Sequence, residues 1–117
     1  MEDPKAILED FEWGFNALGK ADKKRLDAFW SFLQTSYEPE YVDEKTKELI
    51  LVGAALCARC IYCITYHCRD ALKAGASRGE IVQTGWIVTV MCGGPAMAYM
   101  MTYLMKCLDT FGPEFGK

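Results

Sequence analysis

The chain has 117 residues, of which 51% are hydrophobic and 25% are charged, and its formal net charge is −3. This length favours one domain with a buried core of its own. The acidic balance and the lack of a basic stretch exclude the usual electrostatic footprint of a nucleic-acid-binding protein. The first residues, MEDPKAILEDFEWGF, are acidic and lack the apolar stretch of a secretion signal. We therefore expect a cytoplasmic protein whose cysteines are not a structural disulfide set.

Apolar residues recur at helical spacing along the whole chain, and no alternating strand pattern is present. The first helix is expected to begin near Pro4, with its end marked by Gly14 and Gly19. A second helix should begin after Asp22, a favourable N-cap, and end before Pro39, because a residue before proline avoids the helical conformation.

Further helix signals follow at regular intervals. Asp43 is the next N-cap candidate, and a fourth helix is expected over residues 60–73. Ser77 and Glu80 form a capping-box pattern that opens a fifth helix, and the Gly-Gly-Pro at 93–95 separates it from a sixth. The sequence therefore predicts an all-α, single-domain fold of about six helices.

Residues 81–105 carry no charge and are long enough to span a bilayer. Several polar residues and the Gly-Gly-Pro break in the middle argue against a membrane span. We expect two buried helices that meet a partner subunit.

The twelve residues 57–68, CARCIYCITYHC, carry four of the six cysteines and the only histidine. The fourth cysteine spacing differs from that of an iron–sulfur run, and a zinc site on Cys60, Cys63 and His67 lacks a fourth ligand. A metal or iron–sulfur module built on Cys57, Cys60, Cys63 and Cys68 is kept as an alternative.

Cys60 and Cys63 are three residues apart, so in the first turn of a helix their sulfurs lie within disulfide reach. The N-terminus of a helix favours a thiolate, because unpaired N–H groups and the helix dipole stabilise negative charge there. His67 follows Cys63 by four residues and shares its helix face, so it can relay a proton to or from that sulfur. The remaining thiols fit a buried core individually; these are Cys57, Cys68, Cys92 and Cys107.

Glu48 stands at the start of the apolar run LILVGAALCA. On one continuous helix it would lie about 18 Å from Cys60. If the chain turns back at residues 57–59, Glu48 comes near His67. The alternative is an exposed glutamate beside Lys45 and Lys47.

Residues 48–99 resemble the carboxymuconolactone decarboxylase superfamily, and in particular its alkylhydroperoxidase D-like branch. The branch motif is a glutamate, eleven residues, CxxC, three residues and a histidine, and it matches Glu48, Cys60, Cys63 and His67. The resemblance covers about residues 22–108. We divide the chain into a helical extension (1–21), the family domain (22–111) and a C-terminal tail (112–117).

The resemblance implies an all-helical homotrimer or hexamer in which Cys60 and Cys63 cycle between dithiol and disulfide, with no other cofactor. It implies that Glu48 and His67 act as a proton relay, and that the partner is a thiol or disulfide protein, a small disulfide or a hydroperoxide. Tyr62 occupies a position where the peroxidases of the family have a histidine, which limits the expectation of efficient peroxide turnover.

We therefore expect a thiol-disulfide oxidoreductase. Cys63 is the thiol that the relay should deprotonate, and Cys60 is its exchange partner and resolving thiol. The alternative on the same scaffold is a non-redox enzyme, similar to the lactone decarboxylases, that uses His67 and Glu48 as acid and base.

Overall fold

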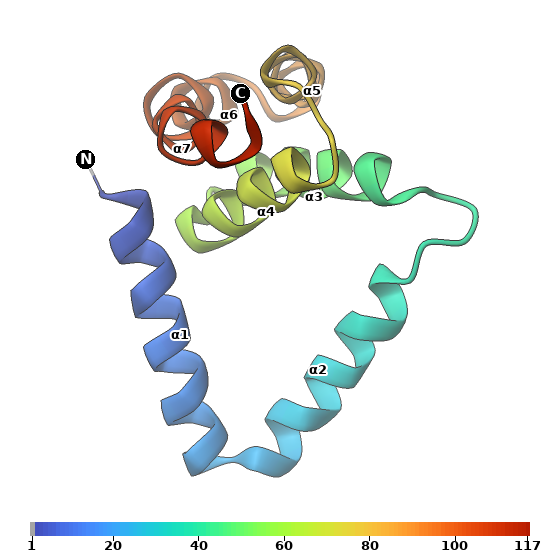
Figure 1. Ribbon diagram of the computed structural model, residues 1–117, viewed down its shortest axis with the longest axis vertical. Coiled ribbons are helices and arrows are strands. Elements are labelled where there is room, and N and C mark those ends of the chain that lie inside the picture. The colour runs from blue at the N-terminus through green and yellow to red at the C-terminus, as the bar shows by residue number, and fades with distance from the viewer. Residues whose placement is uncertain (1) are drawn as a thin grey trace.

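The computed structural model describes residues 2–117 and is built of helices throughout (Figure 1). No strand is present among these residues, so the all-α prediction is confirmed. The elements are α1 (Pro4–Ala21), α2 (Lys23–Tyr37), α3 (Glu44–Ala58), α4 (Ile61–Lys73), α5 (Arg78–Cys92), α6 (Gly94–Tyr99), a π-helical turn (Met100–Leu104), α7 (Met105–Phe111) and a 3₁₀ turn (Gly112–Phe115).

Most helix starts are set by side chains that the sequence places at the N-cap. The Asp22 carboxylate accepts the Arg25 N–H at 3.2 Å, and the Asp43 carboxylate accepts the Thr46 N–H at 2.7 Å. At α5 both hydrogen bonds of the capping box are made. The side chain of Ser77 accepts the backbone N–H of Glu80, and the side chain of Glu80 accepts the backbone N–H of Ser77. These bonds satisfy N–H groups that a helix leaves unpaired at its first turn.

Two boundaries differ from the sequence expectation. Helix α1 runs through both Gly14 and Gly19 to Ala21, because nothing at either glycine requires a positive φ. The last segment is continuous from Gly94 to Phe111 but widens into a π turn at its centre. No sequence signal predicted this turn.

Helix α3 lies at the centre of the fold, packed against α4 on one side and α5 on the other. Gly53 allows the close approach of α3 and α5, and Gly85 allows Met100 of the π-helical turn to pack closely on α5. A Cβ atom on Gly53 would lie 2.7 Å from Cγ1 of Val88, and one on Gly85 would lie 2.2 Å from Sδ of Met100. The core side chains beneath include Val52, Leu56, Ile64, Leu72, Ile81, Tyr103, Leu104 and Leu108.

Helices α1 and α2 form a V that extends away from the packed helices α3–α7 (Figure 1). Helix α1 packs on α4, whereas α2 contacts α1 and has no buried residue. The inner side of α2 is nevertheless apolar, with Phe29 57% and Trp30 42% exposed. An exposed apolar face of this kind is typical of interaction surfaces.

The uncharged stretch 81–105 is less buried than the sequence suggested. Helix α5 buries only Ile81 and Gly85, and its outer side exposes Trp86, Ile87, Val90 and Met91. Within residues 2–117, every helix is too short or too polar to cross a membrane.

Candidate active site

The site begins at a tight turn between α3 and α4. Arg59 adopts the left-handed conformation (φ 57°), which is uncommon for a residue other than glycine. Its N–H donates to the Leu56 carbonyl and the Cys60 N–H to the Ala55 carbonyl, both at 3.2 Å, a pattern typical of a helix C-terminus. The turn folds α4 back along α3, and this reversal brings Glu48 beside His67.

Cys60 is the N-cap residue of α4. Its Sγ accepts the backbone N–H of Cys63 at 3.3 Å. Cys60 is half-buried, Cys63 is exposed, and both thiols are free. The Cys60 sulfur therefore occupies the position where a helix offers its unpaired N–H groups to a negative charge.

Cys63 has a different environment from Cys60, although the two sulfurs are neighbours. Although the residue as a whole is exposed, partial burial of the sulfur raises the pKa of Cys63 to about 12, and the adjacent Cys60 acts in the same direction. A thiol whose pKa is raised in this way stays protonated at pH 7. Cys63 therefore needs a base before it can act as a nucleophile.

His67 is held by Glu48. The Glu48 residue is only 3% exposed, and its Oε1 lies 2.9 Å from Nδ1 of His67. Its other oxygen, Oε2, lies 3.1 Å from Nζ of Lys47. Burial by itself would raise the pKa of Glu48, but the bonds to His67 and Lys47 outweigh it and keep that pKa below its usual value. Glu48 is therefore a carboxylate at neutral pH, and it accepts the Nδ1–H of His67.

This pairing leaves Nε2 of His67 free to exchange a proton. Histidine changes charge near neutral pH, and a carboxylate on Nδ1 fixes the tautomer whose Nε2 is a base. His67 and Cys63 are four residues apart on α4 and share one helix face. The arrangement can therefore carry a proton from the Cys63 thiol to His67, directly or through a water.

Sequence reasoning missed two residues of the site. The edge of the Tyr37 ring, at the end of α2, faces His67 with the ring centroids 6.2 Å apart. The ammonium group of Lys47 lies over the Tyr37 ring, 5.1 Å from its centroid, and also bonds to Glu44 at 2.7 Å. The position of Lys47 directly before Glu48 and three residues after Glu44 was the available signal.

These groups line a polar cavity of about 650 Å³ between α2, α3 and α4. Asp70 faces the same cavity, and burial, followed by the charge of Glu48, raises its pKa. Donor atoms of Glu48, His67 and Asp70 lie within 4.8 Å of one another, so these three are the side chains of the cavity that could hold a metal ion. Lys47 already balances one oxygen of Glu48.

The other four cysteines do not join the site as a metal set. Cys57, near the end of α3, forms a disulfide with Cys92 at the end of α5, with their Cα atoms 5.6 Å apart. The expectation that both are unpaired core thiols is therefore wrong, because the close packing of α3 on α5 brings the two helix ends together. Cys68 and Cys107 are fully buried free thiols, as expected. The metal alternative was built on Cys57, Cys60, Cys63 and Cys68, and these four cysteines are therefore not gathered around one point.

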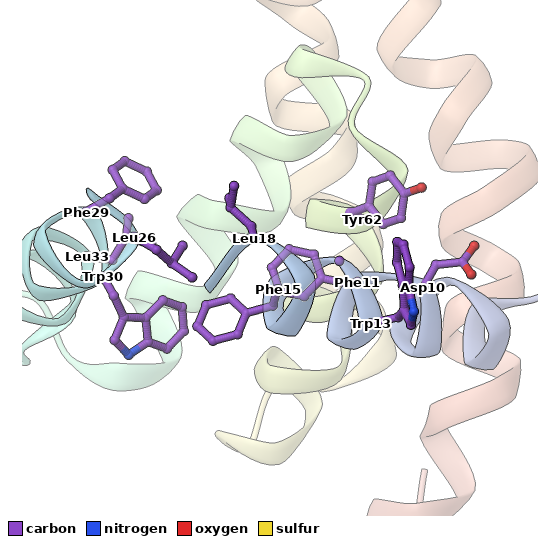
Figure 2. Close-up of a pocket in the computed structure, with 11 residues that line it drawn as sticks. Asp10, Phe11, Trp13, Phe15, Leu18, Leu26, Phe29, Trp30, Leu33 and Tyr62 are labelled. Atoms are coloured by element: carbon purple, nitrogen blue, oxygen red, sulfur yellow. The ribbon is translucent and has the colours of Figure 1, made fainter. Parts of the chain in front are cut away.

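Tyr62, between the two site cysteines, faces a second cavity. An apolar groove of about 630 Å³ lies between α1 and α2, with Tyr62 on its wall (Figure 2). The ring of Tyr62 lies 6.4 Å from that of Phe11, so it packs against α1. Glu48, His67 and Lys47 line the polar cavity and not this groove.

Several known proteins are similar to this chain in sequence, and one solved structure is also similar to it in fold. Residues 24–105 match the model of the carboxymuconolactone decarboxylase family. "Uncharacterized protein 4 in cox locus" from Paracoccus denitrificans is 32% identical over 73 residues, which is 62% of this chain and 66% of that protein. An uncharacterized protein from Cupriavidus necator is 30% identical over 97 residues, 83% of this chain and 86% of that protein.

A solved structure extends the similarity to the whole fold. The apo crystal structure of a carboxymuconolactone decarboxylase family protein from Legionella pneumophila superposes with a TM-score of 0.84 and 28% identity, covering 100% of both chains. Because the family model spans more than half of this sequence, the assignment rests on sequence as well as on shape. The chain belongs to the carboxymuconolactone decarboxylase family.

Proposed function

We propose that this protein is a thiol-disulfide oxidoreductase of the alkylhydroperoxidase D-like type, with Cys60 and Cys63 as its redox pair. The observation that supports this most is the alignment of four groups along one helix and its neighbour. Cys60 caps α4, Cys63 occupies its first turn, and His67 follows on the same face with Nδ1 held by the buried Glu48.

The first step is the attack of the Cys60 thiolate on a disulfide or a hydroperoxide. Its sulfur already accepts the Cys63 N–H, a bond that strengthens when the sulfur is charged. With a disulfide, the substrate S–S bond breaks, one sulfur bonds to Cys60 and the other leaves as a thiolate. With a hydroperoxide, the O–O bond breaks, Cys60 becomes a sulfenic acid, and the alkoxide leaves as an alcohol after taking a proton from water. The sequence predicted Cys60 as the resolving thiol. The environment of the two thiols instead favours Cys60 as the attacking thiol, with Cys63 as the resolving one.

The second step is the attack of Cys63 on the modified Cys60 sulfur. His67 takes the Cys63 proton as the new sulfur–sulfur bond forms, and the proton then passes to the leaving thiol or hydroxide. Glu48 stabilises the imidazolium that exists during this step. The product is the Cys60–Cys63 disulfide, and an external thiol donor must return two electrons to complete the cycle.

The test uses a small aromatic disulfide, 5,5′-dithiobis(2-nitrobenzoate), whose thiolate product is coloured. Reduced wild-type protein should release two equivalents in two phases, one for each step. The variant C63S should release one and retain a mixed disulfide on Cys60, and C60S should lose the fast phase. The double variant C57S/C92S serves as the control and should keep both phases.

Alkylation of the two cysteines distinguishes the redox proposal from the non-redox alternative. An acid–base enzyme that uses His67 and Glu48 would keep its activity after Cys60 and Cys63 are alkylated. A wild-type protein that releases only one equivalent, as C63S should, and retains a mixed disulfide on Cys60 would refute the redox proposal.

We further infer that the chain acts as a homo-oligomer. The apolar side of α5 and the inner side of α2 are both exposed in a single chain, and a second copy would cover them. Sedimentation at micromolar concentration should show a multimer, and W86E should shift it toward smaller species. A wild-type protein that sediments as a monomer would contradict this inference.

A further inference from the structure

Within residues 2–117, two apolar faces are left uncovered by the chain's own helices. The first is the groove between α1 and α2, where Phe15 lies opposite Trp30 with the ring centroids 5.2 Å apart (Figure 2). The second is a stripe along the outer side of α5, whose members share one helix face by their spacing; they are Trp86, Ile87, Val90 and Met91. Exposed apolar faces of this kind are typical of contact surfaces.

The α5 stripe cannot fill the groove of its own chain. Helix α5 packs on α3, and α1 packs on α4. The α3–α4 pair therefore lies between α5 and the V that α1 and α2 form (Figure 1). A helix that enters the groove must come from another molecule.

The lining of the groove favours an uncharged helix. Among the described residues that line it, Asp10 alone is charged, and the others are aromatic, aliphatic or glycine. A charged partner would lose its hydration in such a groove and find no counter-charge except at Asp10. Helix α5 carries no charge from Ile81 to Cys92. Its outer side can therefore be buried in the groove without the loss of any hydrated charge.

Shape and area also favour this pairing. A groove is concave and the side of one helix is convex, so a groove accepts a helix, whereas two grooves cannot fill each other. Four rings of the groove are between 38% and 75% exposed; they are Phe11, Trp13, Phe29 and Trp30. A buried aromatic ring covers about 150–250 Å², so a neighbour could bury about 400 Å² on these four alone. This is about half of the roughly 800 Å² that each partner of a specific interface buries.

We propose that the outer side of α5 in one copy of the chain seats in the α1–α2 groove of the next copy. Each chain then gives a helix to one neighbour and receives a helix from another, and closure of this head-to-tail arrangement makes a ring. Tyr62, between Cys60 and Cys63, is on the groove wall, so the neighbour's α5 lies beside the first turn of α4. This inference rests on the proposed homo-oligomer and names the two surfaces that form its interface.

Two variants break one face each. F29E places a charge in the groove, and W86E places one in the α5 stripe. Both residues are more than half exposed, so the core should fold in both variants. F32E is the matched control, because Phe32 also lies on α2 and is 63% exposed but does not line the groove. Thermal unfolding of each variant checks that the fold is retained.

The measurement is sedimentation at micromolar concentration of each variant and of an equimolar mixture of F29E and W86E. Alone, F29E and W86E should each sediment as monomers, and F32E should keep the size of the wild-type multimer. The mixture should form dimers, because the intact α5 of F29E seats in the intact groove of W86E. These dimers should not grow further, since the two faces that remain are both broken.

An F29E protein of wild-type size would overturn the role of the groove while leaving the homo-oligomer intact. A mixture that stays monomeric would also overturn the pairing, as would either variant that forms dimers by itself, since that shows contact between like faces. Dissociation of F32E to the same extent as F29E would place the contact outside the groove and overturn the proposal. Failure of the homo-oligomer itself looks different, because the wild-type protein would then sediment as a monomer.

Discussion

Replacing Glu48 by glutamine removes the charge at the centre of the relay while conserving its shape. An amide that donates to Nδ1 of His67 forces the other tautomer, in which Nε2 carries the proton and is no base. General-base catalysis contributes about 10²–10⁴-fold, so the second phase of thiolate release should slow by that factor in E48Q. The first phase, which depends on Cys60, should change little.

The same substitution has a predicted effect on stability. Two charge-assisted bonds of Glu48, at 2.9 and 3.1 Å, become neutral or are lost, which costs about 1–3 kcal/mol of the free energy of unfolding. The folded protein lowers the pKa of Glu48, so this stability is present above the unfolded value and is lost as the pH falls through the folded value. The difference between wild type and E48Q should therefore be constant above about pH 5 and shrink in more acidic solution.

Urea unfolding at several pH values and rapid-mixing kinetics measure the two effects. The matched control is E44Q, which also contacts Lys47 but has a side chain that is 52% exposed and does not touch His67. E44Q should lose well under 1 kcal/mol and keep a second phase much closer to that of wild type. An E48Q protein with the second-phase rate of wild type would refute the assignment of Glu48 and His67 as the relay.

Three other predictions concern the framework and the surface. C57S opens the crosslink to Cys92, which closes a loop of 35 residues, and should lower the free energy of unfolding by about 3–4 kcal/mol; the loss should vanish in reductant, and an unchanged urea midpoint without reductant would contradict it. G85A should cost about 1–3 kcal/mol, because the new Cβ would meet Sδ of Met100 at 2.2 Å, whereas G79A, whose Cβ has only an ordinary contact, should not destabilise; equal midpoints for the two would count against the packing described. Y62F should keep the rates of both phases, since the Tyr62 ring packs on α1 outside the polar cavity, and a slower second phase would instead place its hydroxyl in the relay.

Local signals in the sequence predicted the helices well. Asp22, Asp43 and Ser77 are N-caps whose bonds reach only three residues along the chain, so their effect does not depend on the rest of the fold. The π turn at Met100–Leu104 has no such local signal, and it was missed.

The site depended on one turn that the sequence leaves ambiguous. Glu48 and His67 meet only because Arg59 takes a left-handed conformation, which glycine usually marks and arginine does not. Residue spacing alone therefore left the partner of Glu48 open, and the family resemblance pointed to His67.

The pairing of Cys57 with Cys92 was beyond sequence reasoning. Six cysteines allow about 15 complete pairings, and spacing does not select among them. The approach of α3 to α5 depends on the small residue at position 53, whose role is visible only once the two helices are in place. Lys47 and Tyr37 were missed for a related reason, since their contacts join three different helices.

The central claim is that Cys60 is the attacking thiol and that Cys63 is a resolving thiol, which needs a base. Its most direct test is the alkylation of the reduced wild-type protein by iodoacetamide from pH 5 to pH 9, with each cysteine followed by peptide mass spectrometry. We predict that Cys60 is labelled faster than Cys63, because the Cys60 sulfur accepts an N–H at the start of α4, whereas burial and the neighbouring Cys60 raise the pKa of Cys63. Faster labelling of Cys63 than of Cys60 would contradict the account.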